Sequence, residues 1–137
     1  MSRIFLDTNI LVYAYDTKQP LKRDRALEIV ASFGSRKQTA VISTQVLQEF
    51  YHILANKMKF SRKDAAGELL VLLKMEVFQV TPAIILKATE LHDTASISFW
   101  DALIVCAAQA AGCQEIWTED LSTGQKFGSV TIVNPLL

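Results

Sequence analysis

The feature of this sequence that most constrains its fold is a short apolar run near the amino terminus that ends in polar residues. Residues 4–6 are Ile-Phe-Leu, and Asp7, Thr8 and Asn9 follow them directly. An apolar run this short is typical of a strand that is buried on both faces of a parallel sheet. Ligands of open parallel sheets bind beyond the carboxyl ends of the strands, so Asp7 is a candidate site residue. Asp is also a good helix N-cap, and this alternative interpretation of Asp7 stays open.

Strands and helices alternate along the rest of the chain. The apolar spacing predicts strands at residues 40–43, 77–80, 116–118 and 130–133. It also predicts helices at residues 10–15, 20–33, 46–54 and 99–111, and helices that begin after the capping residues Ser61 and Thr81. This alternation predicts an α/β fold, a three-layer α/β/α sandwich with a mostly parallel central sheet of about five strands, in one domain spanning residues 1–137.

Length and composition narrow the class of protein. A chain of 137 residues fits one domain with its own core. Cys106 and Cys113 lie in an apolar stretch without metal-ligand spacing, so we expect free, buried thiols. Residues 97–111 are apolar but too short to span a membrane, and the polar residues 7–9 interrupt any signal peptide. We therefore expect a cytoplasmic protein without a membrane partner.

The formal net charge is zero, but the charges are unevenly distributed. Basic residues form two clusters, Lys18, Lys22, Arg23 and Arg25 in the first and Lys57, Lys59, Arg62 and Lys63 in the second. Residues 76–120 hold seven acidic residues against Lys87 alone. A basic rim beside an acidic region is compatible with a polyanion held near metal ions. Each basic cluster is equally compatible with an ordinary solvated helix face.

Three further carboxylates share the unusual position of Asp7. Glu49 lies on the flank of an apolar helix face, Asp101 interrupts an apolar segment, and Asp120 follows a predicted strand. The carboxyl ends of parallel strands meet at one edge of the sheet, so all four side chains could converge. Each also has an ordinary explanation: Ser98-x-x-Asp101 has capping-box spacing, Glu49 could be solvated, and Asp120 could form a turn.

Several carboxylates in one pocket repel one another unless a cation neutralises them. A ligand set of oxygens without Cys or His favours Mg²⁺ or Mn²⁺ over zinc. In enzymes, these cations activate water and neutralise charge in phosphate chemistry. The acidic residues therefore predict a Mg²⁺ or Mn²⁺ site and a reaction at phosphate.

Four segments resemble the motifs of PIN-domain ribonucleases, and among them the VapC-type toxins of bacterial toxin–antitoxin pairs. The segments are Phe5-Leu6-Asp7-Thr8-Asn9-Ile10, Ile42-Ser43-x-Gln45-Val46-Leu47-x-Glu49-Phe50, Ser98-Phe99-Trp100-Asp101-Ala102-Leu103-Ile104 and Trp117-Thr118-Glu119-Asp120-Leu121. The resemblance covers the whole chain, and the four motifs occur in the order and at the separations of the family.

The resemblance implies a metal-dependent endoribonuclease that hydrolyses RNA phosphodiesters and leaves 5′-phosphate and 3′-hydroxyl ends. The implied catalytic quartet is Asp7, Glu49, Asp101 and Asp120. Asp7 and Asp101 would bridge or directly hold the Mg²⁺ or Mn²⁺, and the other two would complete the site. Polar residues that would orient these ligands and waters are Thr8, Asn9, Ser43 and Thr118.

The resemblance also implies three partners: an RNA substrate, a cognate antitoxin protein and a second copy in a homodimer. A covered surface is expected as well, because half of the residues are hydrophobic and several aromatic residues occur near two early helices. These aromatic residues are Tyr13, Tyr15, Phe50 and Tyr51. The alternative from another class is a PIN-like scaffold that binds RNA or protein without cleavage, which the complete quartet disfavours. A P-loop enzyme is excluded, since the chain contains no Gly-x-x-x-x-Gly-Lys sequence.

Overall fold

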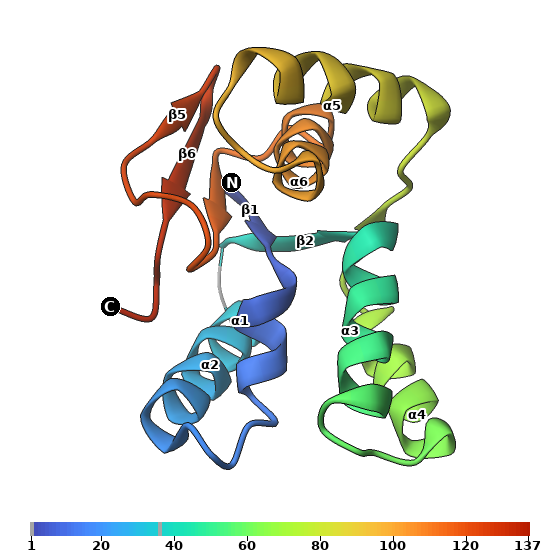
Figure 1. Ribbon diagram of the computed structural model, residues 1–137. Helices are drawn as coiled ribbons and strands as arrows, with labels where there is room; N and C mark the ends of the chain where they lie inside the picture. Colours follow the sequence, from blue (N-terminus) through green and yellow to red (C-terminus); the bar gives the residue numbers. More distant parts are fainter. Residues whose placement is uncertain (1, 36) are drawn as a thin grey trace.

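The computed structural model describes residues 2–35 and 37–137, in which six strands form one sheet in the order β3-β2-β1-β4-β6-β5 (Figure 1). The strands are β1 (Arg3–Leu6), β2 (Thr39–Ser43), β3 (Glu76–Phe78), β4 (Glu115–Trp117), β5 (Lys126–Phe127) and β6 (Val130–Val133). All neighbouring pairs are parallel except β5 and β6. The prediction of a mostly parallel sheet is confirmed.

The sheet has one strand more than the five or so that the sequence predicts. The additional strand, β5, is two residues long and pairs with β6 in an antiparallel hairpin. Gly128 makes the turn between them with φ of 61°, a conformation that glycine adopts without steric cost. So short a strand beside a turn has no apolar run that would reveal it in the sequence.

β1 lies at the centre of the sheet because its residues are apolar on both faces. Ile4, Phe5 and Leu6 are at most 1% exposed. β1 pairs with β2 on one side and with β4 on the other. The chain first extends the sheet from β1 to β3 and later from β4 to β6, so the strand order changes direction between β1 and β4. In open α/β sheets, the crevice at such a point is the usual ligand site.

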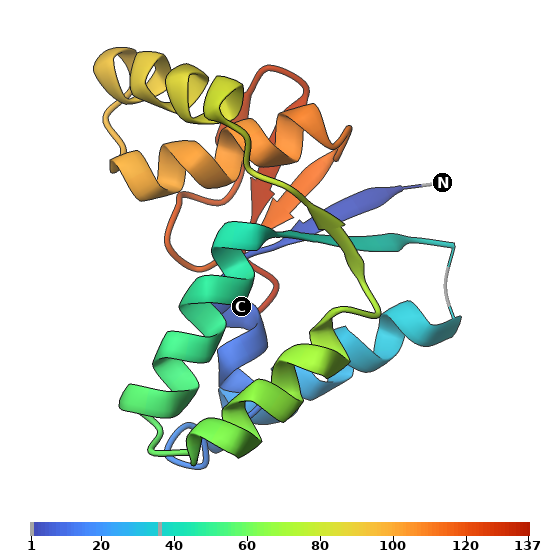
Figure 2. The same cartoon turned by 90° about the vertical axis from the view of Figure 1, so that its right-hand side faces the viewer.

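Helices cover both faces of the sheet (Figures 1 and 2). One face carries α1 (Thr8–Tyr13), α2 (Pro20–Ser32), α3 (Thr44–Asn56) and α4 (Arg62–Leu72). The other face carries α5 (Pro82–Thr94) and α6 (Phe99–Ala110). The predicted three-layer α/β/α sandwich is therefore confirmed. None of the helices in the described residues is both long enough and apolar enough to cross a membrane.

Side-chain oxygens fix where most of the helices begin, although α2 has no such cap. In four helices, a hydroxyl accepts a hydrogen bond from the backbone N–H three residues on, and the residues that do so are Ser43, Ser61, Thr81 and Ser98. Asp7 caps α1 by accepting from the N–H of Thr8. For this reason α1 begins at Thr8, two residues before the predicted start, and places the polar residues of its first turn at the sheet edge.

The aromatic residues expected at a covered surface belong largely to the core, which corrects that expectation. Phe50 is fully buried, and Tyr15 packs edge-to-face against both Phe50 and Phe60. Tyr51 is partly buried and packs against the same core. Large apolar residues that are exposed instead include Leu21, Leu27, Leu70, Val71, Leu73, Ile85, Leu86 and Trp100.

Both cysteines are free and buried, as predicted. Burial raises the pKa of Cys106, and it raises the pKa of Cys113 to about 11. The two thiols therefore stay protonated and contribute to packing.

Candidate functional site

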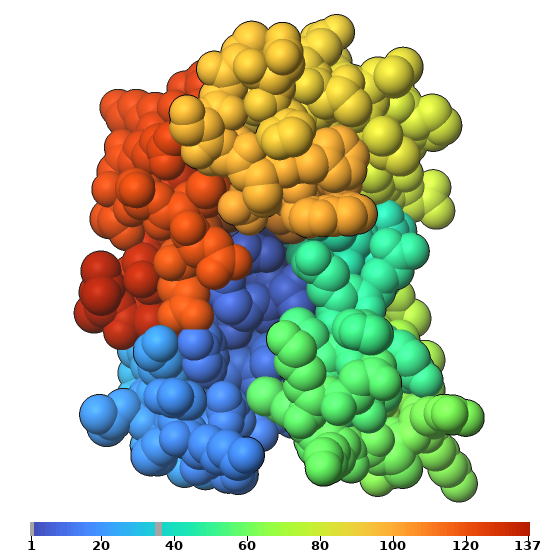
Figure 3. Space-filling model, viewed as in Figure 1, coloured from blue at the N-terminus to red at the C-terminus, as the bar shows by residue number. Residues whose placement is uncertain are grey.

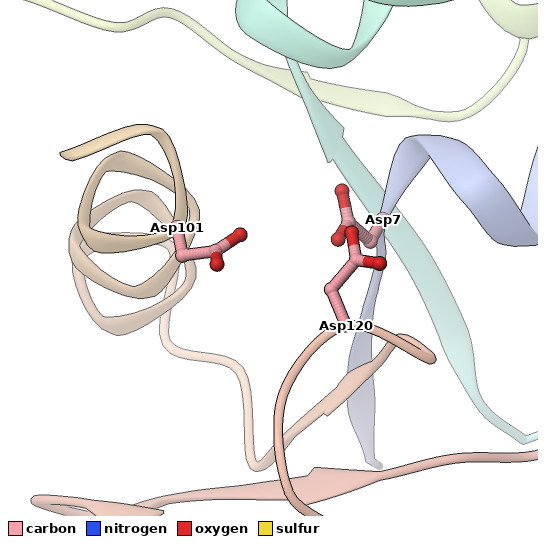
Figure 4. Close-up of side chains that lie close together, drawn as sticks. All are labelled: Asp7, Asp101 and Asp120. Atoms are coloured by element: carbon pink, nitrogen blue, oxygen red, sulfur yellow. The ribbon is translucent and has the colours of Figure 1, made fainter. Parts of the chain in front are cut away.

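Three of the predicted carboxylates converge at the edge of the sheet where β1 and β4 end (Figure 4). Asp7 follows β1, Asp120 lies in the loop after β4, and Asp101 lies in the first turn of α6. Each offers one carboxylate oxygen, and these oxygens lie within 4.8 Å of one another. We call these residues the aspartate triad. Figure 4 shows Asp101 pointing from α6 toward the other two carboxylates.

The pairing of the strands explains why Asp7 and Asp120 are neighbours. β1 and β4 are parallel, with Leu6 opposite Trp117, so the chain leaves both strands at the same level. The backbone N–H of Asp7 extends this pairing by donating to the carbonyl of Trp117 at 3.0 Å. Residues that follow the two strands are therefore held side by side, although they lie far apart in the sequence.

Asp101 is positioned by the cap of α6. The Ser98 hydroxyl accepts a hydrogen bond from the backbone N–H of Asp101 at 3.1 Å, and the carboxylate of Asp101 lies close to those of Asp7 and Asp120. The capping spacing in the sequence and the role of Asp101 at the site are therefore compatible. Burial raises the pKa of Asp101, the Ser98 hydroxyl opposes that shift, and the negative charge of Asp120 adds to it.

Asp7 has the most unfavourable environment of the triad for a negative charge. It is 5% exposed, and burial is the main reason that its pKa rises from 3.8 to about 7. The Thr118 hydroxyl donates to one oxygen at 2.8 Å and the Thr8 N–H to the other at 2.7 Å, and both lower the pKa. The charges of Asp120 and Glu49 raise it further.

Asn9 and Thr118 join the parts of the site into one hydrogen-bond network. The Asn9 amide donates to Asp120 Oδ2 at 3.0 Å and to Thr118 Oγ1 at 3.2 Å. The Thr118 hydroxyl oxygen also accepts from the Asp120 N–H at 3.0 Å. The polar residues that were expected to surround the carboxylates thus contact them directly in the case of Thr8, Asn9 and Thr118.

The other two predicted residues, Glu49 and Ser43, lie differently. Glu49 is outside the triad, although it lines the same cavity, and its Oε1 accepts a hydrogen bond from the Thr8 hydroxyl at 2.7 Å. Ser43 is fully buried and caps α3, accepting from the Val46 N–H at 3.4 Å. Ser43 therefore fixes the start of the helix that carries Glu49 and does not contact the triad.

The triad lies in a cavity of about 720 Å³ that is open to solvent. Figure 3 shows the hollow between the blue α1–α2 segment, the green α3 and the orange α6. Its lining includes Lys18 from one wall and Lys57 and Lys59 from the other. Within residues 2–35 and 37–137, no carboxylate lies within ion-pair distance of these three lysines, whereas Lys22 forms an ion pair with Glu119. Unpaired cations thus rim an acidic floor.

Several residues around the cavity were not predicted from the sequence as site residues. Glu119 is next to Asp120, but its carboxylate accepts from Tyr13 at 2.5 Å and from Lys22 at 3.1 Å, which anchors the loop to α1 and α2. Gln45 and Trp100 also line the cavity. The apolar spacing of α3 and α6 does not reveal that Gln45 and Trp100 lie at the cavity. These two residues belong to the first turns of different helices, which meet only in the folded chain.

Comparisons with known proteins agree on one family. The family model described as PIN domain matches residues 4–123. Ribonuclease VapC7 of Mycobacterium tuberculosis is 30% identical over 121 residues, which cover 85% of this chain and 81% of the relative. This match is consistent with the four motifs in the sequence.

Solved structures show the same fold at lower identity. A toxin–antitoxin complex from Klebsiella pneumoniae contains a chain that is 18% identical, with a TM-score of 0.69 and coverage of 96% of this chain and 97% of that one. VapBC2 from Rickettsia felis, bound to a DNA fragment from its promoter, gives 22% identity, a TM-score of 0.65 and coverage of 96% and 98%. The fold similarity extends over almost the whole chain in both cases.

Proposed function

Because this chain belongs to the PIN-domain family, we propose that it is a metal-dependent endoribonuclease and the toxin of a toxin–antitoxin pair, with residues 1–137 as one nuclease domain. The observation that carries the proposal is the aspartate triad, which joins three separate elements of the fold. A cap or a solvated flank explains a single carboxylate. Neither explains three carboxylates that approach within 4.8 Å against their mutual repulsion.

The chemistry of the triad fits a divalent cation. Asp7, Asp101 and Asp120 offer only carboxylate oxygens, the ligands that Mg²⁺ and Mn²⁺ prefer. The raised pKa of Asp7 supports this fit, since its charged form is unfavourable until a cation compensates it. These three residues would hold the Mg²⁺ or Mn²⁺, and Glu49 would complete the acidic lining. When bound, such a cation supplies an activated water and neutralises charge on the leaving oxygen of a phosphodiester.

The surrounding residues of the chain orient the acidic groups for that task. Thr8 and Thr118 fix the two oxygens of Asp7, and Thr8 also holds Glu49 through its hydroxyl. The side-chain amide of Asn9 holds Asp120 by donating a hydrogen bond to its carboxylate. Preorganised groups of this kind reduce the rearrangement that the reaction requires. We propose that Thr8, Asn9 and Thr118 position the catalytic carboxylates and that Ser43 contributes by fixing α3.

The rim of the cavity supports a nucleic acid as the substrate. Lys18, Lys57 and Lys59 line the cavity from two walls and have no acidic partner in the described residues. Phosphates of an RNA strand would pair with such lysines on either side of the bond that is cut. The acidic floor and the basic rim together favour a substrate in which the phosphodiester to be cut lies over the triad and the neighbouring phosphates of the strand contact the lysines.

We also propose two protein partners. The solved structures with this fold include toxin–antitoxin complexes, and a cognate antitoxin is the corresponding partner for this chain. Exposed apolar residues on α2, α4 and α5 offer surface for an antitoxin and for a second copy in a homodimer; examples are Leu21, Leu70 and Leu86. We propose a cytoplasmic location for the protein, where RNA and an antitoxin would both be within its reach.

A cleavage assay with purified protein tests the proposed function. Wild-type protein should cleave single-stranded RNA in Mg²⁺ or Mn²⁺ into fragments with 5′-phosphate ends, and EDTA should stop the reaction. Asp7→Asn should abolish cleavage, whereas Asp93→Asn, an exposed residue on α5, should leave it unchanged. Cleavage by the Asp7→Asn protein at the wild-type rate would contradict the proposal. Binding of RNA without any cleavage by wild type would favour the non-cleaving scaffold.

A further inference from the structure

Trp100 is the largest exposed apolar side chain at the edge of the acidic cavity. It is 61% exposed, although it immediately precedes Asp101 in the first turn of α6. Tryptophan is usually well buried, because its ring is large and mostly apolar. Most of the indole ring of Trp100 is therefore exposed to solvent beside the aspartate triad, although burying it would stabilise the fold.

A second cavity of about 370 Å³ adjoins the acidic one at this point. Gln45 and Trp100 line both cavities, so the two cavities lie next to each other. The remaining walls of the second cavity are mainly apolar and include Ile85, Phe99 and Leu103. It thus offers a mainly apolar space beside the cavity that holds the aspartate triad.

The contacts of Trp100 hold its position in the folded protein. Its ring packs against Phe99 with centroids 5.2 Å apart and an angle of 70° between the planes. The Gln45 side chain, which is 6% exposed, donates from Nε2 to the Trp100 carbonyl at 3.2 Å. Gln45 Oε1 is buried and has no hydrogen-bond partner in the described residues, which is an uncommon state for a buried polar atom. Both the backbone carbonyl and the ring of Trp100 are therefore in contact with neighbouring side chains.

We propose that Trp100 and the second cavity form a nucleobase subsite, in which a base of the RNA strand next to the cleaved bond stacks on the indole ring. This inference rests on the proposed ribonuclease function. Aromatic side chains beside a basic groove are the usual stacking partners of single-stranded bases, since every base has an aromatic face. The unpaired lysines of the neighbouring cavity supply the basic groove. Gln45 acts as a positioning residue that holds the backbone of Trp100.

Stacking distinguishes this subsite from simple attraction to phosphate. Binding to the rim lysines depends on the charge of the strand alone, whereas the subsite requires a base. The subsite also predicts a single-stranded substrate, because a base within a duplex cannot leave its stack without a cost in free energy. Trp100 would then contribute to substrate binding and to the choice of cleavage position, without direct contact to the reacting atoms.

A binding experiment in EDTA tests the subsite without cleavage. The ligands are a short oligouridine RNA and an abasic ribose-phosphate oligomer of the same length and charge. The background is Trp117→Phe, which leaves Trp100 as the only tryptophan. We expect the RNA to quench Trp100 fluorescence and to bind roughly 5- to 100-fold more tightly than the abasic oligomer. Trp100→Ala, assayed with a labelled RNA, should remove that preference, and Trp100→Phe should keep most of it.

The outcomes separate this inference from the proposed function. An equal preference for RNA over the abasic oligomer in wild type and Trp100→Ala would overturn the subsite, even if the protein cleaves RNA. A base-dependent preference that requires Trp100 would support the subsite, even if no cleavage is found. Loss of self-association in Trp100→Ala, measured by sedimentation, with an unchanged preference for bases would assign this surface to a second copy and overturn the subsite. In the cleavage reaction, Trp100→Ala should raise KM and leave kcat within about threefold, since stacking supplies binding energy.

Discussion

Asp7 is a buried carboxyl group whose charge is opposed by its surroundings. Its pKa is raised from 3.8 to about 7, mainly by burial, so the folded protein binds this proton more tightly than the unfolded chain does. The contribution of Asp7 to stability is therefore complete below the unfolded pKa and is lost as the pH rises through about 7. The site holds a group that weakens the fold at neutral pH, as functional sites often do.

This electrostatic cost predicts a pH dependence that Asp7→Asn removes. In EDTA, the free energy of unfolding of wild type should fall, relative to the variant, as the pH rises from 3.8 to about 7. The difference between the two proteins should reach up to about 4 kcal/mol, because each pKa unit corresponds to about 1.4 kcal/mol. Urea unfolding at a series of pH values measures it. If wild type and Asp7→Asn show parallel curves, Asp7 does not carry the proposed strain.

Variants of Asp101 and Ser98 distinguish the contribution of the α6 cap to stability from the contribution of the acidic site. Ser98→Ala removes the hydroxyl that accepts from the Asp101 N–H, and should cost about 1 kcal/mol with or without Mn²⁺. Asp101→Asn retains the capping serine and removes a repelling charge, so in EDTA it should melt no lower than wild type.

Mn²⁺ should then distinguish the two variants. At a hundredfold excess over the dissociation constant, Mn²⁺ should stabilise wild type and Ser98→Ala by about 2.7 kcal/mol. Asp101→Asn should lose most of that gain, since it lacks one of the proposed ligands. Thermal melts of the three proteins, with and without Mn²⁺, give the answer. A full Mn²⁺ shift in Asp101→Asn would exclude Asp101 from the cation site.

At the scale of elements, the segment between α3 and α4 supplies one basic wall of the cavity. Lys57 and Lys59 line the cavity, whereas Arg62 and Lys63 of the same sequence cluster lie in the first turn of α4 outside its lining. Lys59 has φ of 58°, an uncommon conformation for a residue with a side chain. The structure thus divides a cluster that the sequence could only treat as a unit.

This division predicts unequal effects on RNA binding. Replacing Lys57 and Lys59 by Gln should weaken binding and reduce the slope of log K against log salt by about 1.4, since each phosphate contact to a single strand contributes about 0.7. The same change at Arg62 and Lys63 should alter the slope much less. Fluorescence anisotropy of a labelled RNA over a range of salt concentrations measures both. If the slope of log K against log salt is the same in the two double variants, Lys57 and Lys59 are ordinary solvated surface residues without a special role in RNA binding.

Elements with a strong local signal were predictable from the sequence. The apolar run of β1, the caps at Ser61 and Thr81 and the continuous apolar stretch of α6 each determine their own structure. The start of α1 was less predictable, because Thr8 and Asn9 are polar and become helical only through the cap that Asp7 provides. The strand β5 depends on pairing with β6 and has no signal of its own.

At the scale of the whole molecule, the order of the strands creates the site. β1 and β4 are neighbours at the point where the strand order changes direction, which forms a crevice at the edge of the sheet. The amino-terminal end of α6, which carries Asp101, lies at this crevice. The sequence could predict that carboxylates gather at this edge, because the rule depends on topology alone. It could not predict that Glu49 pairs with Thr8 outside the triad, or that Trp100 stays exposed beside it, since these contacts depend on how the helices pack.

The Mn²⁺ dependence of RNA cleavage by two neighbouring variants tests the central claim most directly. Asp120 belongs to the aspartate triad, whereas Glu119, one residue earlier, is bound by Tyr13 and Lys22. Wild-type cleavage should rise with Mn²⁺ and saturate, and Glu119→Gln should follow the same curve to within about tenfold in rate, a loss of about 1.4 kcal/mol. Asp120→Asn should remain inactive at Mn²⁺ concentrations that saturate wild type. Equal activity of Asp120→Asn and wild type, or cleavage by wild type in EDTA, would contradict the account.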